Sequence, residues 1–146
     1  MGDPFEQVRA RRAGLRAAID RVERSLATPA PGRADKWRKE VLAELQALGE
    51  ALEVHIAANE APGGLLADIM EEAPRLAHRV NVLRDNHEQL RASLGAAVAA
   101  VEHDTGDDVT ASRDRVVELL GGLVRHRHLG ADLVYEAYNV DIEAAD

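Results

Sequence analysis

The chain has 146 residues and a net charge of −8 at pH 7, and 46% of its residues are hydrophobic but only 3% are aromatic. This length predicts one domain with a core of its own, which the composition makes aliphatic. The acidic balance argues against binding to nucleic acids, which depends on neutralising phosphates, and against adhesion to anionic membranes. The sequence has no cysteine, which excludes thiol catalysis, disulfides, iron–sulfur clusters and thiolate zinc sites.

The sequence also bears on where the protein resides. The first residues, MGDPFEQVRARR, contain no apolar signal core, and no apolar run reaches the length of about 18 residues that a membrane helix needs. We therefore expect a soluble, cytoplasmic protein with no membrane partner.

Hydrophobic periodicity predicts four long helices, over residues 4–27, 35–60, 74–103 and 110–140, in a single domain that spans residues 1–146. A short helical piece is expected over residues 65–72. Long helices joined by short connections are typical of an antiparallel, up-down-up-down four-helix bundle. The predicted fold class is therefore all-α.

In each of three predicted helices, apolar residues recur every three or four positions and form a seam. A histidine occupies one position of each seam. His55 lies in the seam of the second helix, His87 in that of the third and His128 in that of the fourth. The seam expected for the fourth helix consists of Val117, Gly121, Val124, His128, Ala131, Tyr135 and Tyr138. A histidine in a core position costs free energy unless it has a hydrogen-bond partner or binds a metal.

The three histidines are predicted to lie at one height in the bundle. The midpoint between His55 and His87 falls just before Pro74, and the midpoint between His87 and His128 falls in the Asp-rich turn. In an antiparallel bundle such positions face each other. The seam residue of the first helix near that height is Arg12. The sequence thus predicts a polar layer inside the bundle.

Further candidate ligands flank the histidines. Asp132 follows His128 by one helical turn, Asn59 follows His55 by one turn, and Glu60 comes next. Imidazole with carboxylate suits iron, manganese or zinc, and facing helices of bundles assemble metal sites in this way.

Two further residues on the fourth helix need an assignment. Tyr135 is predicted to be a core tyrosine with a hydrogen-bonded hydroxyl, beyond the histidine layer. His126 lies about 200° around the helix from His128, so both cannot share one face. We therefore expect His126 to serve in packing or on the surface, with metal ligation as the minor alternative.

Three segments, LEVHIAANE, LRDNHEQLR and LVRHRHLGADLVYEAY, carry a resemblance to the hemerythrin-like (HHE cation-binding) family. The resemblance extends from about Arg11 to Tyr138. It implies a four-helix bundle that holds two non-haem irons and that binds oxygen, senses oxygen or iron, stores iron, or handles peroxide and nitric oxide. It further implies that His55, His87, His128 and Asp132 are metal ligands and that Glu60 is a possible one.

The chain departs from the family pattern at three positions. Arg12 stands where the first helix should supply a histidine, Asn59 stands where the second should supply a carboxylate, and Arg91 replaces a second histidine on the third. An arginine in the seam requires a carboxylate partner, unless its long stem carries the charge into solvent.

Three functional hypotheses follow. The first is a non-haem protein, with one or two iron ions, that binds or senses oxygen, peroxide or iron rather than turning over an organic substrate; its partner would be a small diatomic molecule or peroxide. The second is a metal-free interaction or regulatory module, in which Arg12 pairs with Asp132 and the protein partner is unidentified. The third is an oxidoreductase that consumes peroxide or nitric oxide.

Overall fold

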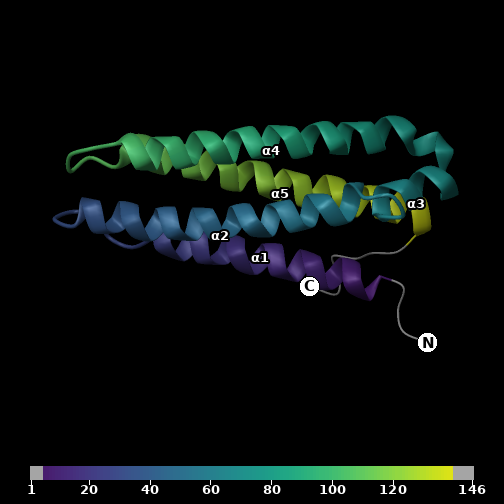
Figure 1. The fold of residues 1–146 in the computed structure, drawn as a ribbon, viewed down its shortest axis with the longest axis horizontal. Helices are drawn as coiled ribbons and strands as arrows, with labels where there is room; N and C mark the ends of the chain where they lie inside the picture. Colours follow the sequence, from purple (N-terminus) through teal and green to yellow (C-terminus); the bar gives the residue numbers. More distant parts are fainter. Residues whose placement is uncertain (1–4, 140–146) are drawn as a thin grey trace.

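Four long helices packed antiparallel form the molecule, as the computed structural model shows for residues 5–139 (Figure 1). The predicted all-α class and the antiparallel packing of sequence-adjacent helices are confirmed. Residues 4 and 140, predicted as the outer ends of the first and fourth long helices, lie outside the described residues. The elements are α1 (Glu6–Leu26), α2 (Ala34–Glu60), the short α3 (Leu65–Glu72), the 3-10 turn η1 (Pro74–Leu76), α4 (Ala77–His103) and α5 (Thr110–Tyr138).

The bundle consists of two helical hairpins. α1 packs along α2, and α4 packs along α5. The hairpins meet mainly through α2 and α4, whereas α1 and α5 approach each other at few positions. Figure 1 shows both hairpin connections at one end of the molecule and α3 at the other. The side of the bundle between α1 and α5 is therefore its least tightly joined seam.

A tight reversal after α2 places α3 against the end of the bundle. Gly63 has a φ of +77°, a left-handed conformation that glycine adopts without steric cost. A Cβ on the neighbouring Gly64 would lie 2.5 Å from the carbonyl oxygen of Ala58. Two glycines are therefore needed here, and the apolar side of α3, with Leu66 and Ile69 fully buried, closes this end of the core.

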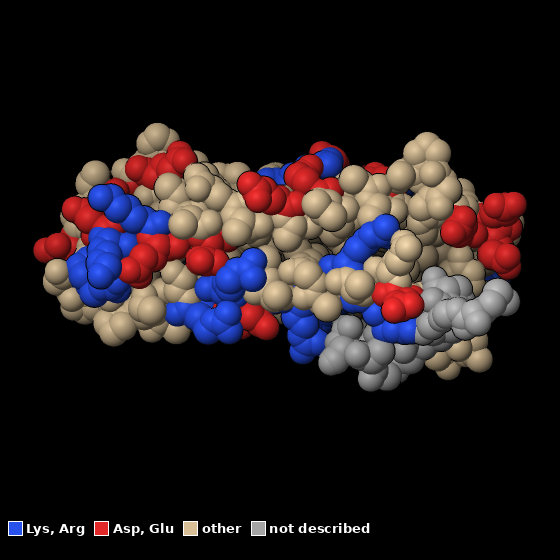
Figure 2. Space-filling model, turned by 60° about the horizontal axis from the view of Figure 1, so that its bottom comes forward, with Lys and Arg blue, Asp and Glu red and all other residues tan. Residues whose placement is uncertain are grey.

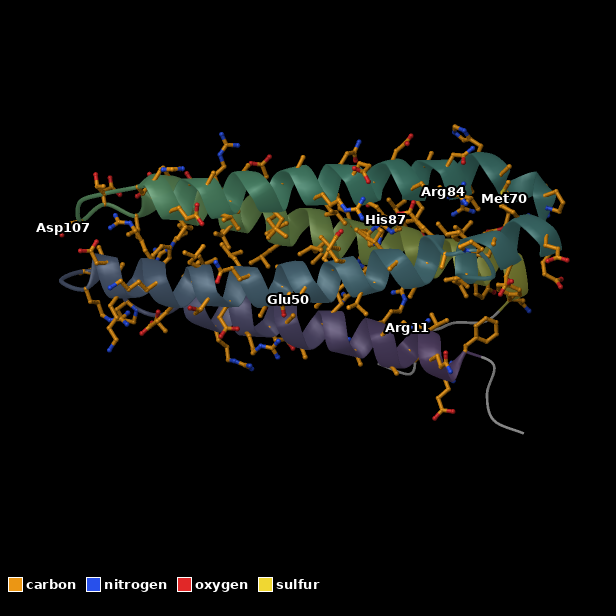
Figure 3. The ribbon with its side chains drawn as sticks, in the orientation of Figure 1. Arg11, Glu50, Met70, Arg84, His87 and Asp107 are labelled. Carbon is orange, nitrogen blue, oxygen red and sulfur yellow. The ribbon has the colours of Figure 1, made fainter. Side chains whose placement is uncertain are left out.

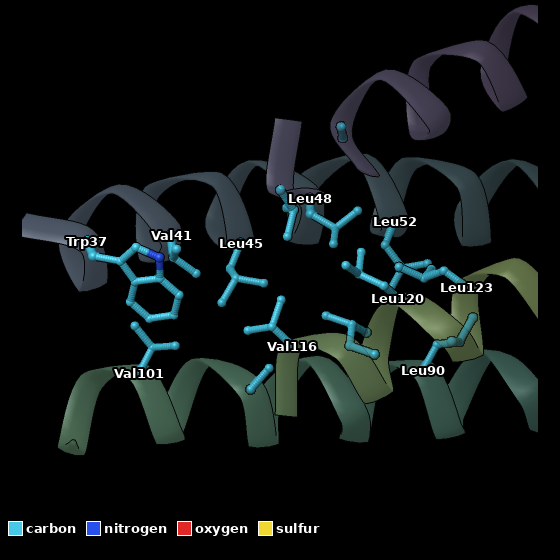
Figure 4. Packing of buried hydrophobic residues seen from close by; sticks show 14 of the residues in the cluster. Trp37, Val41, Leu45, Leu48, Leu52, Leu90, Val101, Val116, Leu120 and Leu123 are labelled. Carbon is cyan, nitrogen blue, oxygen red and sulfur yellow. The ribbon is translucent and has the colours of Figure 1, made fainter. Parts of the chain in front are cut away.

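The hydrophobic core is divided into two clusters. The larger one fills the end near the hairpin connections and includes residues from Ala34 to Ile56 on α2 and from Val116 to Leu123 on α5 (Figure 4). The smaller one lies at the α3 end and includes Leu83 and Leu133. A layer of polar residues separates them, to which each long helix contributes one member: Arg12, His55, His87 and His126.

The surface of the bundle carries charges of both signs, mixed over the face that Figure 2 shows. Arg21 of α1 pairs with Glu44 of α2 at 3.3 Å, and both side chains are partly exposed. Exposed pairs of this kind contribute about 0–1 kcal/mol each. Stability therefore depends mainly on the two apolar clusters. Among residues 5–139, no helix combines the length and the apolar character that crossing a bilayer requires.

The rotation of α5 differs from the one predicted. Val117 is 53% exposed and Tyr135 is 51% exposed, although both were expected in the seam. The buried face is instead formed by Val116, Leu119, Leu120, Leu123, His126, Gly130, Ala131, Leu133 and Val134. α5 carries two stripes with spacings of three and four residues, and the stripe richer in leucine is the buried one because it removes more apolar surface from water. The expectation that His128 faces the core is therefore wrong.

Candidate metal centre

Three histidine side chains meet inside the bundle. His55 comes from α2, His87 from α4 and His126 from α5, and their exposed fractions are 7%, 0% and 3%. One ring nitrogen of each lies within 4.8 Å of the corresponding nitrogens of the other two. The ring centroids are 5.8 Å apart for His55 and His87, 5.3 Å for His55 and His126, and 4.8 Å for His87 and His126. This buried group could hold a metal ion.

His87 presents one ring nitrogen to the layer and the other to a carboxylate. Figure 3 shows His87 pointing from α4 toward the interior of the bundle. Its Nδ1 lies 2.9 Å from Oε2 of Glu60, at the end of α2. Its Nε2 is buried and has no hydrogen-bond partner among residues 5–139. A carboxylate on Nδ1 keeps the proton there, so the free lone pair is on Nε2.

His126 is oriented in the same way by an amide. Its Nδ1 lies 2.7 Å from Oδ1 of Asn86, and Nδ2 of Asn86 donates to Oε1 of Gln89 at 3.1 Å. Because Oδ1 is only an acceptor, the proton of a neutral His126 is on Nδ1. The lone pair on Nε2 then faces the layer, as it does in His87.

His55 stands between two such lone pairs. Its Nε2 lies 3.1 Å from Nε2 of His126, which makes His55 the donor of this hydrogen bond in the absence of an ion. Asn59 donates from Nδ2 to the backbone carbonyl of His55 at 2.7 Å. The N–H of His55 is thus a single donor that faces two inward lone pairs, those of His87 and His126. It bonds to the lone pair of His126, so the lone pair of His87 is left without a donor. A cation accepts electron pairs from all three rings and removes this imbalance.

Burial keeps the imidazoles neutral. Loss of solvation, together with smaller contributions from the nearby His87 and Arg12, lowers the pKa of His55 to about 4. Loss of solvation likewise lowers the pKa of His126 to about 3, with His55, His87 and Arg12 as additional causes. Burial also lowers the pKa of His87, although the hydrogen bond to Glu60 opposes the shift. Neutral imidazole is the form that binds metals.

Arg12 of α1 completes the layer. Its guanidinium donates to the backbone carbonyl oxygen of Arg127 at 3.3 Å from Nη2 and 3.5 Å from Nη1. A Cβ on Gly130 would lie only 2.6 Å from Nη2 of Arg12, so glycine is what makes room for the guanidinium against α5. Two small cavities, of about 20 and 30 Å³, are both lined by Arg12, His55 and His126.

The structure brings together some of the sequence-predicted residues and separates others. His55 and His87 are in the layer, and Glu60 reaches it through its contact with Nδ1 of His87. Asn59 lines the smaller cavity beside His55. His128 and Asp132 are exposed on α5, and so is Tyr135.

The predicted ion pair between Arg12 and Asp132 is not seen, because Asp132 lies on the exposed face of α5. Arg91, at the position of the family's second histidine, is also outside the layer. It bridges α4 to Glu53 of α2 at 2.8 Å and contacts Glu88.

Sequence reasoning missed two residues of the site. His126 was assigned to packing or the surface, with metal ligation only as the minor alternative, yet it takes the place in the layer expected for His128. The leucine-rich stripe of α5, which includes Leu119 and Leu123, was the signal for the correct face. Asn86 was not singled out, because an asparagine next to a core histidine has no distinctive spacing.

A search of protein-family models, of curated proteins and of solved structures finds no significant match to this chain. The resemblance to hemerythrin-like proteins therefore has no support from these comparisons. The structure supports a four-helix, all-α protein with a buried three-histidine cluster that could hold a metal ion.

Proposed function

We propose that the protein binds one divalent transition-metal ion through the Nε2 atoms of His55, His87 and His126. The observation that carries the proposal is the buried lone pair on Nε2 of His87, which has no hydrogen-bond partner in the described part of the chain and belongs to a cluster of three convergent imidazoles. Buried polar atoms are rarely left in this state unless they serve a ligand.

One nitrogen pair already has a separation that suits an ion, whereas the widest pair would have to draw closer. Metal–nitrogen bonds of about 2.0–2.1 Å in a tetrahedral site put the ligand nitrogens about 3.3 Å apart. Nε2 of His55 and Nε2 of His126 are 3.1 Å apart, and the widest separation in the cluster is under 4.8 Å. On binding, the proton of His55 would have to move from Nε2 to Nδ1, and the amide of Asn59, whose nitrogen donor is 3.5 Å from Nδ1, would have to turn away.

The hydrogen bonds of the outward ring nitrogens also fit a metal site. Histidines that bind metals commonly donate their other N–H to a carboxylate or a carbonyl oxygen. Glu60 receives this bond from His87, and Asn86 receives it from His126. In this arrangement Glu60 orients a ligand rather than binding the ion itself.

The ligand set favours one ion over two. Two ions in a bundle are commonly bridged by carboxylates. Asp132 is exposed, and Glu60 is held by His87. Imidazole ligands suit iron, zinc, copper and nickel. Ferrous iron is the member of this group that the hemerythrin-like resemblance favours, and binding or sensing of oxygen, peroxide or iron is the function that would go with it.

Three protein ligands leave a fourth coordination position open, which a bound small molecule can occupy. Elemental analysis of protein purified without chelator, followed by anaerobic titration with Fe²⁺, Co²⁺ and Zn²⁺, tests the proposal. We expect one ion per chain, with an absorption change in air if iron is the ion. Failure of all three ions to remain bound after desalting would refute it.

One observation favours a second function. In the absence of an ion, the hydrogen bond of His55 to His126 satisfies two of the three rings, and the positive charge of Arg12 opposes a cation nearby. In this alternative the layer is a metal-free polar core, and the bundle serves as an interaction or regulatory module. The same titration separates the two functions, because a metal-free module retains none of the ions.

A further inference from the structure

One face of α5 is left toward solvent, although its sequence has the spacing of a helix interface. Val117, Gly121, Val124 and His128 follow one another in steps of four, three and four residues, and Tyr135 stands seven residues beyond His128. Helices that pack along each other show this spacing. Val117 and Tyr135 are more than half exposed, and Val124 is 40% exposed. We call these five residues the outer stripe.

The outer stripe differs from the other exposed apolar residues of the bundle. Val54 of α2, Val82 of α4 and Leu129 on another side of α5 stand singly among polar neighbours, which is ordinary for a soluble surface. In the outer stripe, large apolar side chains recur along one line of one helix. Such a line indicates a surface on which another helix packs.

Two charged residues beside the middle of the outer stripe indicate which helix this is. Glu118 and Arg125 are seven residues apart and therefore project from the same side of α5. If a second α5 lay antiparallel about a two-fold axis between residues 121 and 122, Glu118 of each copy would face Arg125 of the other. A parallel arrangement would instead bring like charges together.

Both charges are available for this contact. Arg125 is exposed and takes part in no ion pair within residues 5–139. Glu118 has only an exposed contact of 3.6 Å with Arg115, which contributes little to stability. Gly121 stands at the proposed axis and has no side chain, so a second helix can approach its backbone closely. The contact would form two equivalent ion pairs at once.

The two ends of the same face are complementary in shape. Tyr135 projects at one end of the outer stripe. Beside its other end is a shallow, open hollow between α1 and α5, which is lined by Glu23, Leu26, Ala27 and Arg113.

The axis that pairs the charges also brings this tyrosine and this hollow together. It places Tyr135 of one copy about five residues, or roughly 8 Å, from the level of Arg113 of the other. A tyrosine in a helix leans toward the N-terminus of its own chain, which here is toward the hollow. Glu23 in the hollow offers an acceptor to the tyrosine hydroxyl, and Arg113 offers a cation to its ring.

The size of the surface limits the strength of the contact. The outer stripe is about 27 Å long and a helix is about 10 Å wide, so with the hollow the contact covers on the order of 300–400 Å² per copy. Stable interfaces bury about 800 Å² per partner. The association should therefore be reversible and should depend on protein concentration.

We propose that two copies of this chain associate through the outer stripes of α5, antiparallel about a two-fold axis near Gly121. A second copy is the occupant because one surface supplies both partners of every contact: Glu118 with Arg125, and Tyr135 with the hollow beside Arg113. The proposal goes beyond the metal site, because none of the three buried histidines belongs to the outer stripe.

The experiment is sedimentation velocity of the full chain from low micromolar to near-millimolar concentration. The variants are Glu118→Arg, Arg125→Glu and the double variant that exchanges the two charges. Arg24→Glu is the matched control, a charge reversal at an exposed position of α1. Circular dichroism establishes that each variant is folded.

The native chain should change from monomer to dimer within this range. Each single reversal places like charges at two symmetric positions and should weaken the dimer about tenfold or more. The double variant restores opposite charges and should return the affinity to within about threefold of the native value. Arg24→Glu should leave it unchanged.

Cysteine cross-linking gives a second readout that needs no change of charge. The chain has no cysteine of its own. Under mild oxidation Gly121→Cys should form a disulfide between copies, because this position lies at the axis. Tyr135→Cys should not, because the two copies of this position lie at opposite ends of the contact. Val54→Cys, at an exposed position of α2, is the control and should remain monomeric.

Three results would overturn the proposal. A chain that stays monomeric over the whole concentration range would mean that the outer stripe serves a different partner. A dimer that is indifferent to both charge reversals would have to form through another surface. Cross-linking through Tyr135→Cys as readily as through Gly121→Cys would show that the two helices are parallel.

Discussion

Asn86 Oδ1 lies 2.7 Å from Nδ1 of His126, and this contact decides which nitrogen of His126 faces the interior of the bundle. His87 is oriented in the same sense by Glu60. Two residues that are themselves only partly buried therefore turn two buried lone pairs toward one point. The chemistry of the layer depends on these contacts of Asn86 and Glu60 as much as on the histidines.

The first prediction distinguishes His126 from His128, which sequence analysis placed on the wrong faces of α5. His126→Ala should weaken metal binding at least a hundredfold, because it removes one of three ligands. His128→Ala is the matched control from an exposed position two residues away, and it should leave the metal affinity within about twofold. Calorimetric titration with Zn²⁺ measures both. Equal losses in the two variants would mean that α5 is rotated differently from the structure.

The second prediction concerns the residues that orient the ligands. Glu60→Gln removes the carboxylate that holds the proton on Nδ1 of His87, and it should weaken metal binding about 10- to 100-fold. Asn86→Ala should act on His126 to a similar extent. Glu50→Gln, at an exposed position of α2, is the control and should have no effect. Should Glu60→Gln abolish binding as fully as loss of a histidine does, Glu60 would be a ligand rather than a residue that orients one.

The third prediction is a loss of stability of the apo protein in mild acid. The unfolded chain protonates His55 and His126 near pH 6.5, whereas burial keeps their folded-state pKa values at about 4 and about 3. Below pH 6.5 the unfolded state therefore binds more protons, and the free energy of unfolding falls as the pH falls. Arg12 on α1 opposes protonation of both rings, and Glu60 favours it only at His87.

Between pH 7 and pH 5 the loss should be on the order of 2 kcal/mol for each of the two histidines. Urea unfolding of chelator-treated protein across this range measures it. His126→Gln should flatten the dependence, and His78→Gln, at an exposed position, should not. A free energy of unfolding that stays constant from pH 7 to pH 5 would show that these rings are accessible to protons in the folded state.

The fourth prediction tests the contact between Arg12 and Gly130 by replacing glycine with alanine. Replacing a helical glycine by alanine normally stabilises a helix by roughly 0.5–1 kcal/mol. Gly95→Ala should do so, because a Cβ there meets no atom within 4 Å. Gly130→Ala should instead fail to stabilise the protein, because its Cβ would lie 2.6 Å from Nη2 of Arg12 and the guanidinium would have to give up its bonds to the carbonyl oxygen of Arg127.

A double variant makes this test specific to the guanidinium. In the Arg12→Ala background the obstruction is gone, so Gly130→Ala should now stabilise the protein as Gly95→Ala does. Chemical unfolding of the four proteins gives the coupling between positions 12 and 130. Additive effects would mean that the guanidinium does not rest against Gly130 in solution.

Much of the fold and part of the site could be predicted from the sequence. The seams of α2 and α4 consist mainly of leucine and valine with a single histidine each, so their buried faces could be read from the spacing and His55 and His87 were placed correctly. The height of Arg12 followed from reflection through the first connection. These inferences need only helix geometry and the lengths of the turns.

The face of α5 could not be fixed in the same way. Spacing alone allows either of its two stripes to face the core, and only packing against α4 decides between them. The contact of Glu60 with His87 was also beyond sequence reasoning. Glu60 is one position off the seam of α2, and its long side chain at the helix end reaches a ring on another helix.

The division of the core by the polar layer has a consequence for how the molecule opens. Helices that share one continuous core unfold together, whereas a core interrupted by polar residues permits one part to open before the other. The part at the α3 end, built on the smaller cluster around Leu66 and Leu83, is the one that should exchange its amide hydrogens first. An ion held by α2, α4 and α5 would link this end to the rest of the bundle. Binding of the ion should therefore slow amide hydrogen exchange at positions far from the histidine ligands.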